Sequence, residues 1–244
     1  MNASLSILSA AGECSEPSDS RRRFVETRKT HHARWDAQAF ADEQIQNLVR
    51  QVFYPGFPRP ARQVVFSGVL AGQKIASLCV RIGEALAAEG VFNVCVVEAD
   101  LHTRSMQIKF GGTSTDGRDT PDLAGAVRTS SLQLSDHLWL VPAEVFAGNL
   151  AKARSVSWLR ARLGVLRREF DYTVIHTPAF GSASETSLLS HVADGLVLVL
   201  EANRTRRISA KMIGESLKGS NIRLLGAVLS ERTFPIPESL YRRL

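Results

Sequence analysis

The segment VVFSGVLAGQKIASL combines an apolar run with glycines and a lysine, which is how a phosphate-binding loop begins. The pattern of such a loop is G-x-x-x-x-G-K-[ST], in which backbone N–H groups surround the phosphates, the lysine contacts them and the hydroxyl binds Mg²⁺. Gly68 and Lys74 fit this pattern, whereas Gln73 replaces the second glycine and Ile75 replaces the hydroxyl residue. We therefore take Gly68, Gly72 and Lys74 as the candidate nucleotide-binding residues of a degenerate loop.

The elements around this loop alternate between short apolar strands and helix-length segments. The pattern predicts strands at 63–67, 94–100, 138–142, 171–178, 195–202 and 223–230, and helices at 42–53, 74–89, 156–169 and 208–218. Apolar strands separated by helices are typical of a mostly parallel sheet with helices on both faces, so we predict a three-layer α/β fold. Ligands of such folds bind at the carboxyl ends of the strands, where 68–74, 98–100, 176–178 and Ser230 lie in this prediction.

Charge is unevenly distributed along the 244 residues. The formal net charge is +6, and the run RRRFVETRKTHHAR at 21–34 holds six Lys/Arg against one Glu. We divide the chain into a disordered basic segment at 1–41, a helix and proline-rich connector at 42–61, one domain at 62–232 and a tail at 233–244. Low hydrophobicity without periodicity is the basis for calling the first segment disordered.

Cysteine usage and targeting signals indicate the compartment. Cys14, Cys79 and Cys95 show neither metal-ligand nor disulfide spacing, which fits a reducing environment. The first residues lack the charged start and apolar core of a signal peptide, and no apolar run approaches the roughly 18 residues of a membrane span. We therefore expect a cytoplasmic location, with a partner bringing the chain to the inner face of the membrane.

Five segments in a fixed order carry a family resemblance. They are the loop segment above, VCVVEADLHTRS, FDYTVIHTPAF, ADGLVLVLEANRTRR and LLGAVLSERTFPIPESLYRRL. Their order resembles the cytoplasmic domain of bacterial tyrosine autokinases that control capsular and exopolysaccharide export, which are relatives of the ParA/MinD group of P-loop ATPases. The resemblance runs from about Glu43 to the C-terminus. It implies a P-loop NTPase-like fold.

The resemblance also gives roles to residues after the second and third apolar strands. In the family, an Asp-x-Asp pair acts around Mg²⁺ and the attacking hydroxyl, and this sequence offers Glu98 and Asp100 as the candidate catalytic residues. Asp100 fits a turn or cap aspartate as well. The family's Walker B aspartate is replaced by His176, and imidazole is a poor ligand for Mg²⁺. No carboxylate or cysteine spacing joins His176 to His102 or His191, so we predict no metal site.

Three replacements weaken the same function. Gln73, Ile75 and His176 each stand where the family has a group that contacts phosphate or serves Mg²⁺, and a metal stabilises such a transition state by several kcal/mol. Lys74 fits an exposed lysine at a helix start as well as a phosphate contact. Ser230 replaces an asparagine that often contacts the base in the family. We therefore predict a pseudokinase-like protein without enzyme activity or cofactor, binding ATP or ADP with Mg²⁺ weakly at most, as a regulatory or scaffolding partner in exopolysaccharide synthesis and export.

The resemblance implies two kinds of partner: a transmembrane polysaccharide co-polymerase (chain-length protein) and further copies of the chain. In the kinase rings, the helix before the loop docks on a neighbouring subunit. Glu43, Leu48 and Phe53 match its pattern, and they fit equally a helix packed on its own domain. The family carries a C-terminal cluster of autophosphorylated tyrosines, and this tail has a single one, Tyr241, as candidate phospho-acceptor or packing anchor.

Two other functions stay open on the sequence. One is an active ATP-dependent tyrosine autokinase with an unusual site built from Lys74, Glu98 and Asp100. The other is a ParA-like positioning protein that binds DNA or a membrane surface through the basic segment 21–34. That segment is poor in aromatic residues for base stacking and no recognition helix follows it, so we do not expect a nucleic-acid partner.

Overall fold

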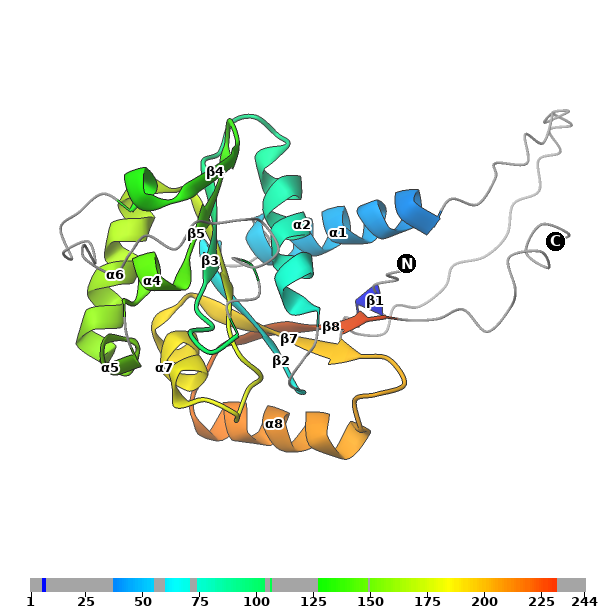
Figure 1. The fold of residues 1–244 in the computed structure, drawn as a ribbon. Helices are drawn as coiled ribbons and strands as arrows, with labels where there is room; N and C mark the ends of the chain where they lie inside the picture. Colours follow the sequence, from blue (N-terminus) through cyan, green and yellow to red (C-terminus); the bar gives the residue numbers. More distant parts are fainter. Residues whose placement is uncertain are drawn as a thin grey trace, which may run out of the picture.

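The structure is a computed structural model that describes residues 6–7, 37–54, 60–70, 74–103, 106, 127–148 and 150–231. Figure 1 shows a central sheet with helices on both sides. Eight strands of the described chain form this sheet, in the order β1-β8-β7-β2-β6-β3-β5-β4. The three-layer, mostly parallel α/β fold predicted from the sequence is confirmed.

The sheet is parallel except at its two edges. Its strands are β1 (Ser6–Ile7), β2 (Gln63–Gly68), β3 (Val94–Glu98), β4 (Leu132–Ser135), β5 (Leu138–Val141), β6 (Tyr172–His176), β7 (Gly195–Glu201) and β8 (Leu224–Ser230). β1 pairs antiparallel with β8, and β4 pairs antiparallel with β5. Every pair of neighbouring strands from β8 across to β5 is parallel. β2 lies between β6 and β7, with Val65 opposite Ile175 on one side and Leu196 on the other. The carboxyl ends of β2, β3 and β6 therefore meet at one edge.

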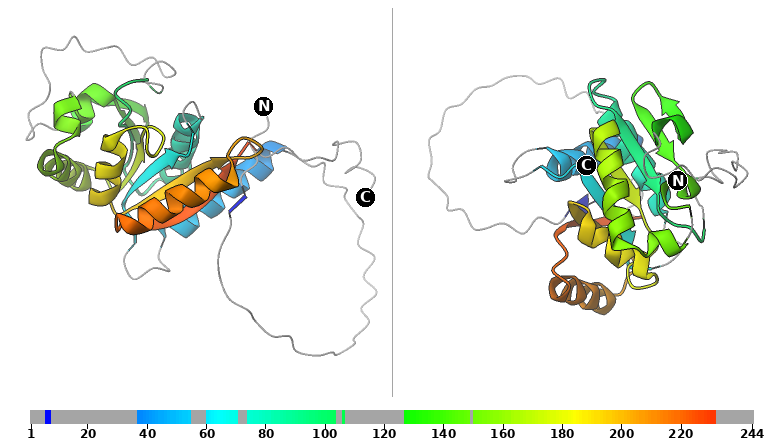
Figure 2. Two further views of the ribbon diagram at one scale, coloured as in Figure 1. Left: turned by 90° about the horizontal axis from the view of Figure 1, so that it is seen from below. Right: turned by 90° about the vertical axis from the view of Figure 1, so that its left-hand side faces the viewer.

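Two apolar layers hold the helices on the sheet, because side chains alternate between its faces. The helices are α1 (Ala37–Phe53), α2 (Ile75–Ala87), α4 (Ala143–Phe146), α5 (Leu150–Ala153), α6 (Val156–Glu169), α7 (Ser184–Val192) and α8 (Arg207–Gly219), with a 3₁₀ turn at Arg128–Ser130. Val64 and Phe66 of β2 pack in one layer with α1 and α2. Val65 packs in the other layer with side chains of α4, α5, α6, α7 and α8. Figure 2 shows these layers from two further directions.

The predicted boundaries differ from the structure mainly at the N-terminal side. Helix α1 begins at Ala37 rather than at residue 42, so the boundary placed after residue 41 lies inside the helix. The physical reason is that Ala41 is buried and extends the apolar stripe of Ile45 and Leu48 by one turn. β1 also lies within the segment 1–41. The rest of that segment, and the tail at 233–244, lie outside the described residues.

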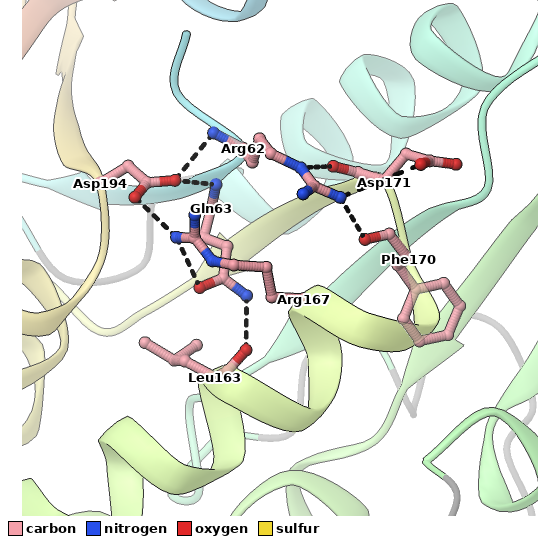
Figure 3. A network of polar contacts seen from close by, with 7 residues as sticks. All are labelled: Arg62, Gln63, Leu163, Arg167, Phe170, Asp171 and Asp194. Atoms are coloured by element: carbon pink, nitrogen blue, oxygen red, sulfur yellow. Dashed lines mark hydrogen bonds and ion pairs between the residues drawn. The ribbon is translucent and has the colours of Figure 1, made fainter. Parts of the chain in front are cut away.

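A polar network, which we call the amino-edge network, joins the amino-terminal ends of β2, β6 and β7 (Figure 3). Its members are Arg62, Gln63, Arg167, Asp171 and Asp194. Asp194 Oδ2 accepts hydrogen bonds from the backbone N–H groups of Arg62 and Gln63, both at 2.8 Å. Asp194 Oδ1 accepts one from the Arg167 guanidinium at 2.6 Å, and the Arg62 guanidinium donates to the Asp171 carbonyl at 2.8 Å. The network therefore fixes the start of three neighbouring strands.

Candidate functional site

The candidate site begins where β2 ends, at the opposite edge from the amino-edge network. The Gly68 carbonyl accepts a hydrogen bond from the Phe180 backbone N–H at 2.8 Å, and the Val69 N–H donates to the Val199 carbonyl at 3.3 Å. Backbone hydrogen bonds thus hold the start of the loop to β7 on one side and to the segment at Phe180 on the other. Gly72 and Gln73 lie outside the described residues, so their roles stay predictions.

Ile75 is the first residue of α2, and its side chain lies in the apolar layer between α2 and the sheet. Only 4% of Ile75 is exposed to solvent. In the phosphate-binding pattern this position carries a hydroxyl that binds Mg²⁺. Here it carries a hydrocarbon side chain that contributes to the core, and it offers no ligand atom to a metal.

Lys74 lies at the N-cap of α2 without a side-chain capping bond. Its side chain is 67% exposed, and its Nζ lies 3.6 Å from Oε1 of Glu231, the residue directly after β8. An exposed pair at this distance contributes about 0–1 kcal/mol to stability. Lys74 is therefore an accessible cation whose charge is partly balanced by Glu231, a partner that no local sequence pattern indicates.

Glu98 and His176 end two adjacent strands and lie opposite each other in the parallel register of β3 and β6. Glu98 is fully buried, and its Oε1 accepts a hydrogen bond from the Met106 backbone N–H at 2.8 Å. The sequence prediction that these two residues meet at one sheet edge is confirmed. The Glu98 carboxylate, however, already serves a local backbone group.

Asp100 closes a turn directly after β3. Its Oδ1 accepts hydrogen bonds from the backbone N–H groups of His102 at 2.9 Å and Thr103 at 3.1 Å, and its Oδ2 accepts one from the Thr103 hydroxyl. This geometry is the turn aspartate that the sequence also allowed, in which a short carboxylate bonds the backbone two and three residues ahead. Asp100 lies at the predicted edge, with its carboxylate occupied by the turn.

His176 is 5% exposed. Burial lowers the pKa of His176 to about 4, and the nearby negative charge of Asp100 opposes this shift only in part. Its Nδ1 is buried and has no hydrogen-bond partner in the described part of the chain. The imidazole is therefore neutral at physiological pH and holds neither the charge nor the oxygen atoms that Mg²⁺ prefers.

Within the described region, no three His, Cys, Asp or Glu side chains lie together so that they could hold a metal ion. A transition-metal site that includes His102 or His191 is therefore not formed by these residues. Two positions that would serve Mg²⁺ in a phosphate-binding site do not fit that role here: Ile75 lies in the core and His176 is neutral.

Sequence reasoning missed several polar contacts that build this edge. The Ser67 hydroxyl donates to the Pro178 carbonyl at 2.7 Å, and the Thr186 hydroxyl donates to the same oxygen at 3.3 Å. Ser230 donates from its hydroxyl to the Leu200 carbonyl at 3.1 Å, which binds it to the neighbouring strand. A serine directly after the apolar run Val64–Phe66 is the signal that could have indicated the first of these contacts.

No protein-family model matches the chain. The chain is 22% identical over 197 residues to the tyrosine-protein kinase YwqD of Bacillus subtilis, covering 80% of this chain and 83% of YwqD. The chain resembles bacterial tyrosine-protein kinases.

Solved structures share the fold of these kinases. The VpsO kinase domain matches with a TM-score of 0.63 at 20% identity, over 80% of this chain and 98% of that domain. A ParA-family ATPase from Chlorobium tepidum matches with a TM-score of 0.53 at 15% identity, over 69% of this chain and 72% of the ATPase. The fold is therefore that of the ParA/MinD-like P-loop NTPases, as the order of motifs predicted.

The helix before the loop packs on its own domain. Leu48 and Phe53 are buried in the layer that α1 shares with α2 and the sheet, whereas Glu43 is exposed. Two of the three residues that match the family's docking pattern thus serve intramolecular packing. Tyr241 lies outside the described residues and stays a candidate phospho-acceptor. No helix in the described ranges is long and apolar enough to cross a membrane.

Proposed function

We propose that this protein is a pseudokinase-like relative of the bacterial tyrosine kinases that does not use Mg²⁺-ATP. It acts as a regulatory or scaffolding partner in exopolysaccharide synthesis and export. Its partner would be a transmembrane polysaccharide co-polymerase, with the chain at the cytoplasmic face of the membrane. We base the partner and the process on the resemblance to kinases, because a fold alone specifies neither.

The observation that carries the proposal is the burial of Ile75. A metal at a phosphoryl-transfer site stabilises the transition state by several kcal/mol, and a loss of that size lowers a rate by several powers of ten. The residue in the metal-binding position of this loop is instead part of the core. His176 supports the same conclusion, because a neutral imidazole replaces the carboxylate on the neighbouring strand.

Calorimetric titration of the full chain with Mg²⁺-ATP tests the proposal. We expect no binding in the micromolar range, because Gly68 and Lys74 remain of the motif among the described residues while the metal-binding hydroxyl is replaced by Ile75. Lys74→Ala and Lys211→Ala form a matched pair, since both lysines are exposed and Lys211 lies on α8. Micromolar binding that disappears in Lys74→Ala and persists in Lys211→Ala would overturn the proposal.

Incubation with labelled ATP gives a second readout. We expect no phosphotyrosine in the wild-type chain, and the Tyr241→Phe variant provides the background signal. Phosphorylation that requires both Tyr241 and Lys74 would identify an active autokinase and contradict the proposal.

Restoring the motif should recover part of the function. The triple variant Gln73→Gly, Ile75→Thr and His176→Asp places the missing groups back, and we expect measurable Mg²⁺-dependent nucleotide binding. The control carries Gln73→Ala, Ile75→Val and His176→Asn. It changes the same three positions but adds neither a hydroxyl at 75 nor a carboxylate at 176. A folded triple variant without any gain over this control would show that the loop has diverged beyond the motif positions.

A further inference from the structure

The outer face of helix α8 carries large apolar side chains that nothing in the described structure covers. Ile208 is 67% exposed and Met212 is 64% exposed. They lie four residues apart, which places them one above the other on the same face of a helix. Exposed apolar residues that are clustered rather than scattered indicate an interaction surface.

The fold of α8 does not require this face. Leu217 is buried against the sheet and Ile213 packs beside it in the same layer. At 100° per residue, Leu217 points roughly opposite to Ile208 and Met212 around the helix. Figures 1 and 2 show α8 on the outside of the sheet, beside β7 and β8, with no other described element over it.

Cations border the apolar pair. Arg206, Arg207, Lys211 and Lys218 are exposed, and Arg207, Lys211 and Lys218 fall within about 40° of one another around the helix. Among the described residues, Lys211 makes an ion pair, at 3.9 Å to Glu215, whereas Arg206, Arg207 and Lys218 make none. By the same geometry Glu215 lies between these cations and the apolar pair, so the outer face of α8 carries a basic stripe, one carboxylate paired with Lys211, and the apolar pair.

Two of these cations do not serve the helix itself. Arg206 is the N-cap and Arg207 the first residue of α8, and its first turn contains no acidic residue. The helix dipole disfavours positive charge at this end by a few tenths of a kcal/mol. Arg206 and Arg207 therefore do not stabilise α8 through its dipole, and an external anionic partner would give their charges a role.

We propose that the outer face of α8 binds the surface of an anionic lipid bilayer. A helix that lies on a bilayer presents apolar side chains to the acyl boundary and Lys/Arg to the headgroups, which is the arrangement of Ile208, Met212 and the basic stripe. Nucleic acid fits the cations but not the apolar pair, and α8 carries no aromatic side chain for base stacking. Binding of a bilayer by α8 requires no nucleotide.

Sedimentation of the full chain with vesicles tests this surface. We expect binding to vesicles of phosphatidylglycerol and phosphatidylcholine in equal parts, little binding to phosphatidylcholine alone, and weakening with salt. Ile208→Ser with Met212→Ser should lower the affinity about tenfold. Arg207→Gln with Lys218→Gln should lower it roughly 30-fold, at about 1 kcal/mol per charge.

Matched controls lie on α6, which packs on the same face of the sheet as α8. Val156→Ser removes another exposed apolar residue, and Arg160→Gln with Arg168→Gln removes two other exposed cations. We expect both controls to bind as the wild type does. Equal binding by the wild type and both α8 variants would overturn the proposal, as would the absence of vesicle binding. Duplex DNA binding that depends on Arg207 and Lys218 but not on Ile208 and Met212, without vesicle binding, would identify a nucleic-acid surface instead.

Discussion

The two ends of the central strands differ in how their polar groups are used. At the amino ends, Asp194 bonds two backbone N–H groups and a guanidinium, so its carboxylate has a partner at each oxygen. At the carboxyl ends, Ile75 is a core residue and His176 keeps a buried Nδ1 without a partner in the described region. The Asp194 carboxylate is paired at both oxygens, whereas the His176 imidazole at the opposite edge is not paired at both nitrogens within the described residues.

The difference separates what the fold needs from what the kinase reaction needs. A buried backbone N–H without a partner costs about 1–3 kcal/mol, so the amino-edge network is required by stability. In the phosphate-binding pattern the metal-binding hydroxyl serves chemistry rather than the core, and here Ile75 fills that position as a core residue. The fold can therefore persist while the function changes.

Breaking the amino-edge network should have the largest effect. Asp194→Ala removes the acceptor of the backbone N–H groups of Arg62 and Gln63, while Arg167 keeps Gln63 Oε1 as an acceptor at 3.1 Å. We therefore expect the free energy of unfolding to fall by about 3–4 kcal/mol. Denaturant unfolding measures this change. Asp194→Asn keeps an acceptor oxygen and should lose less, and Asp136→Ala, at an exposed turn between β4 and β5, should lose almost nothing. An equal loss in all three variants would contradict the assigned role.

Protonation of His176 should have the next largest effect. Its native pKa is lowered to about 4, while the unfolded chain keeps a value near the ordinary 6.5. Between these values the unfolded chain binds more protons, so stability falls as the pH is lowered from 6.5 towards 4, by about 3 kcal/mol at most. The free energy of unfolding is measured for the wild type and for His176→Asn across this pH range. The difference between the two gives the contribution of His176. A difference that does not change with pH would show that His176 is not buried as a neutral base.

Removing the Lys74–Glu231 pair should have the smallest effect. Because both side chains are partly or largely exposed, we expect Lys74→Ala to change the free energy of unfolding by less than about 0.5 kcal/mol. Thermal unfolding at low and high salt checks this value. A loss above 1.5 kcal/mol would mean that Lys74 has a structural role that the exposed pair does not explain.

The sequence predicted the central strands because each is a continuous apolar run buried on both faces, as in β2 and β3. It did not predict β4, whose residues Leu132–Ser135 alternate between partly buried and exposed in a short edge hairpin. It also missed α7, in which few apolar side chains face the core. Short elements with few apolar side chains depend on tertiary contacts more than on a strong local pattern.

The candidate site was predictable in its location and not in its contacts. The rule that ligands lie at the carboxyl ends of parallel strands placed Glu98 beside His176 correctly. The pairing of Lys74 with Glu231, and the bonds of Asp194 to Arg62 and Gln63, join residues more than a hundred positions apart. No local pattern contains that information.

The position of β2 in the sheet has a consequence for synthesis. Both of its neighbours, β6 and β7, come from the second half of the chain. All six residues of β2 are buried in the finished sheet, yet the ribosome adds β6 and β7 only later, on the order of ten seconds at about ten residues per second. During that interval an apolar strand has two unpaired edges, which favours association with other chains. Nascent chains stalled before Glu201 should therefore engage chaperones more strongly than completed ones.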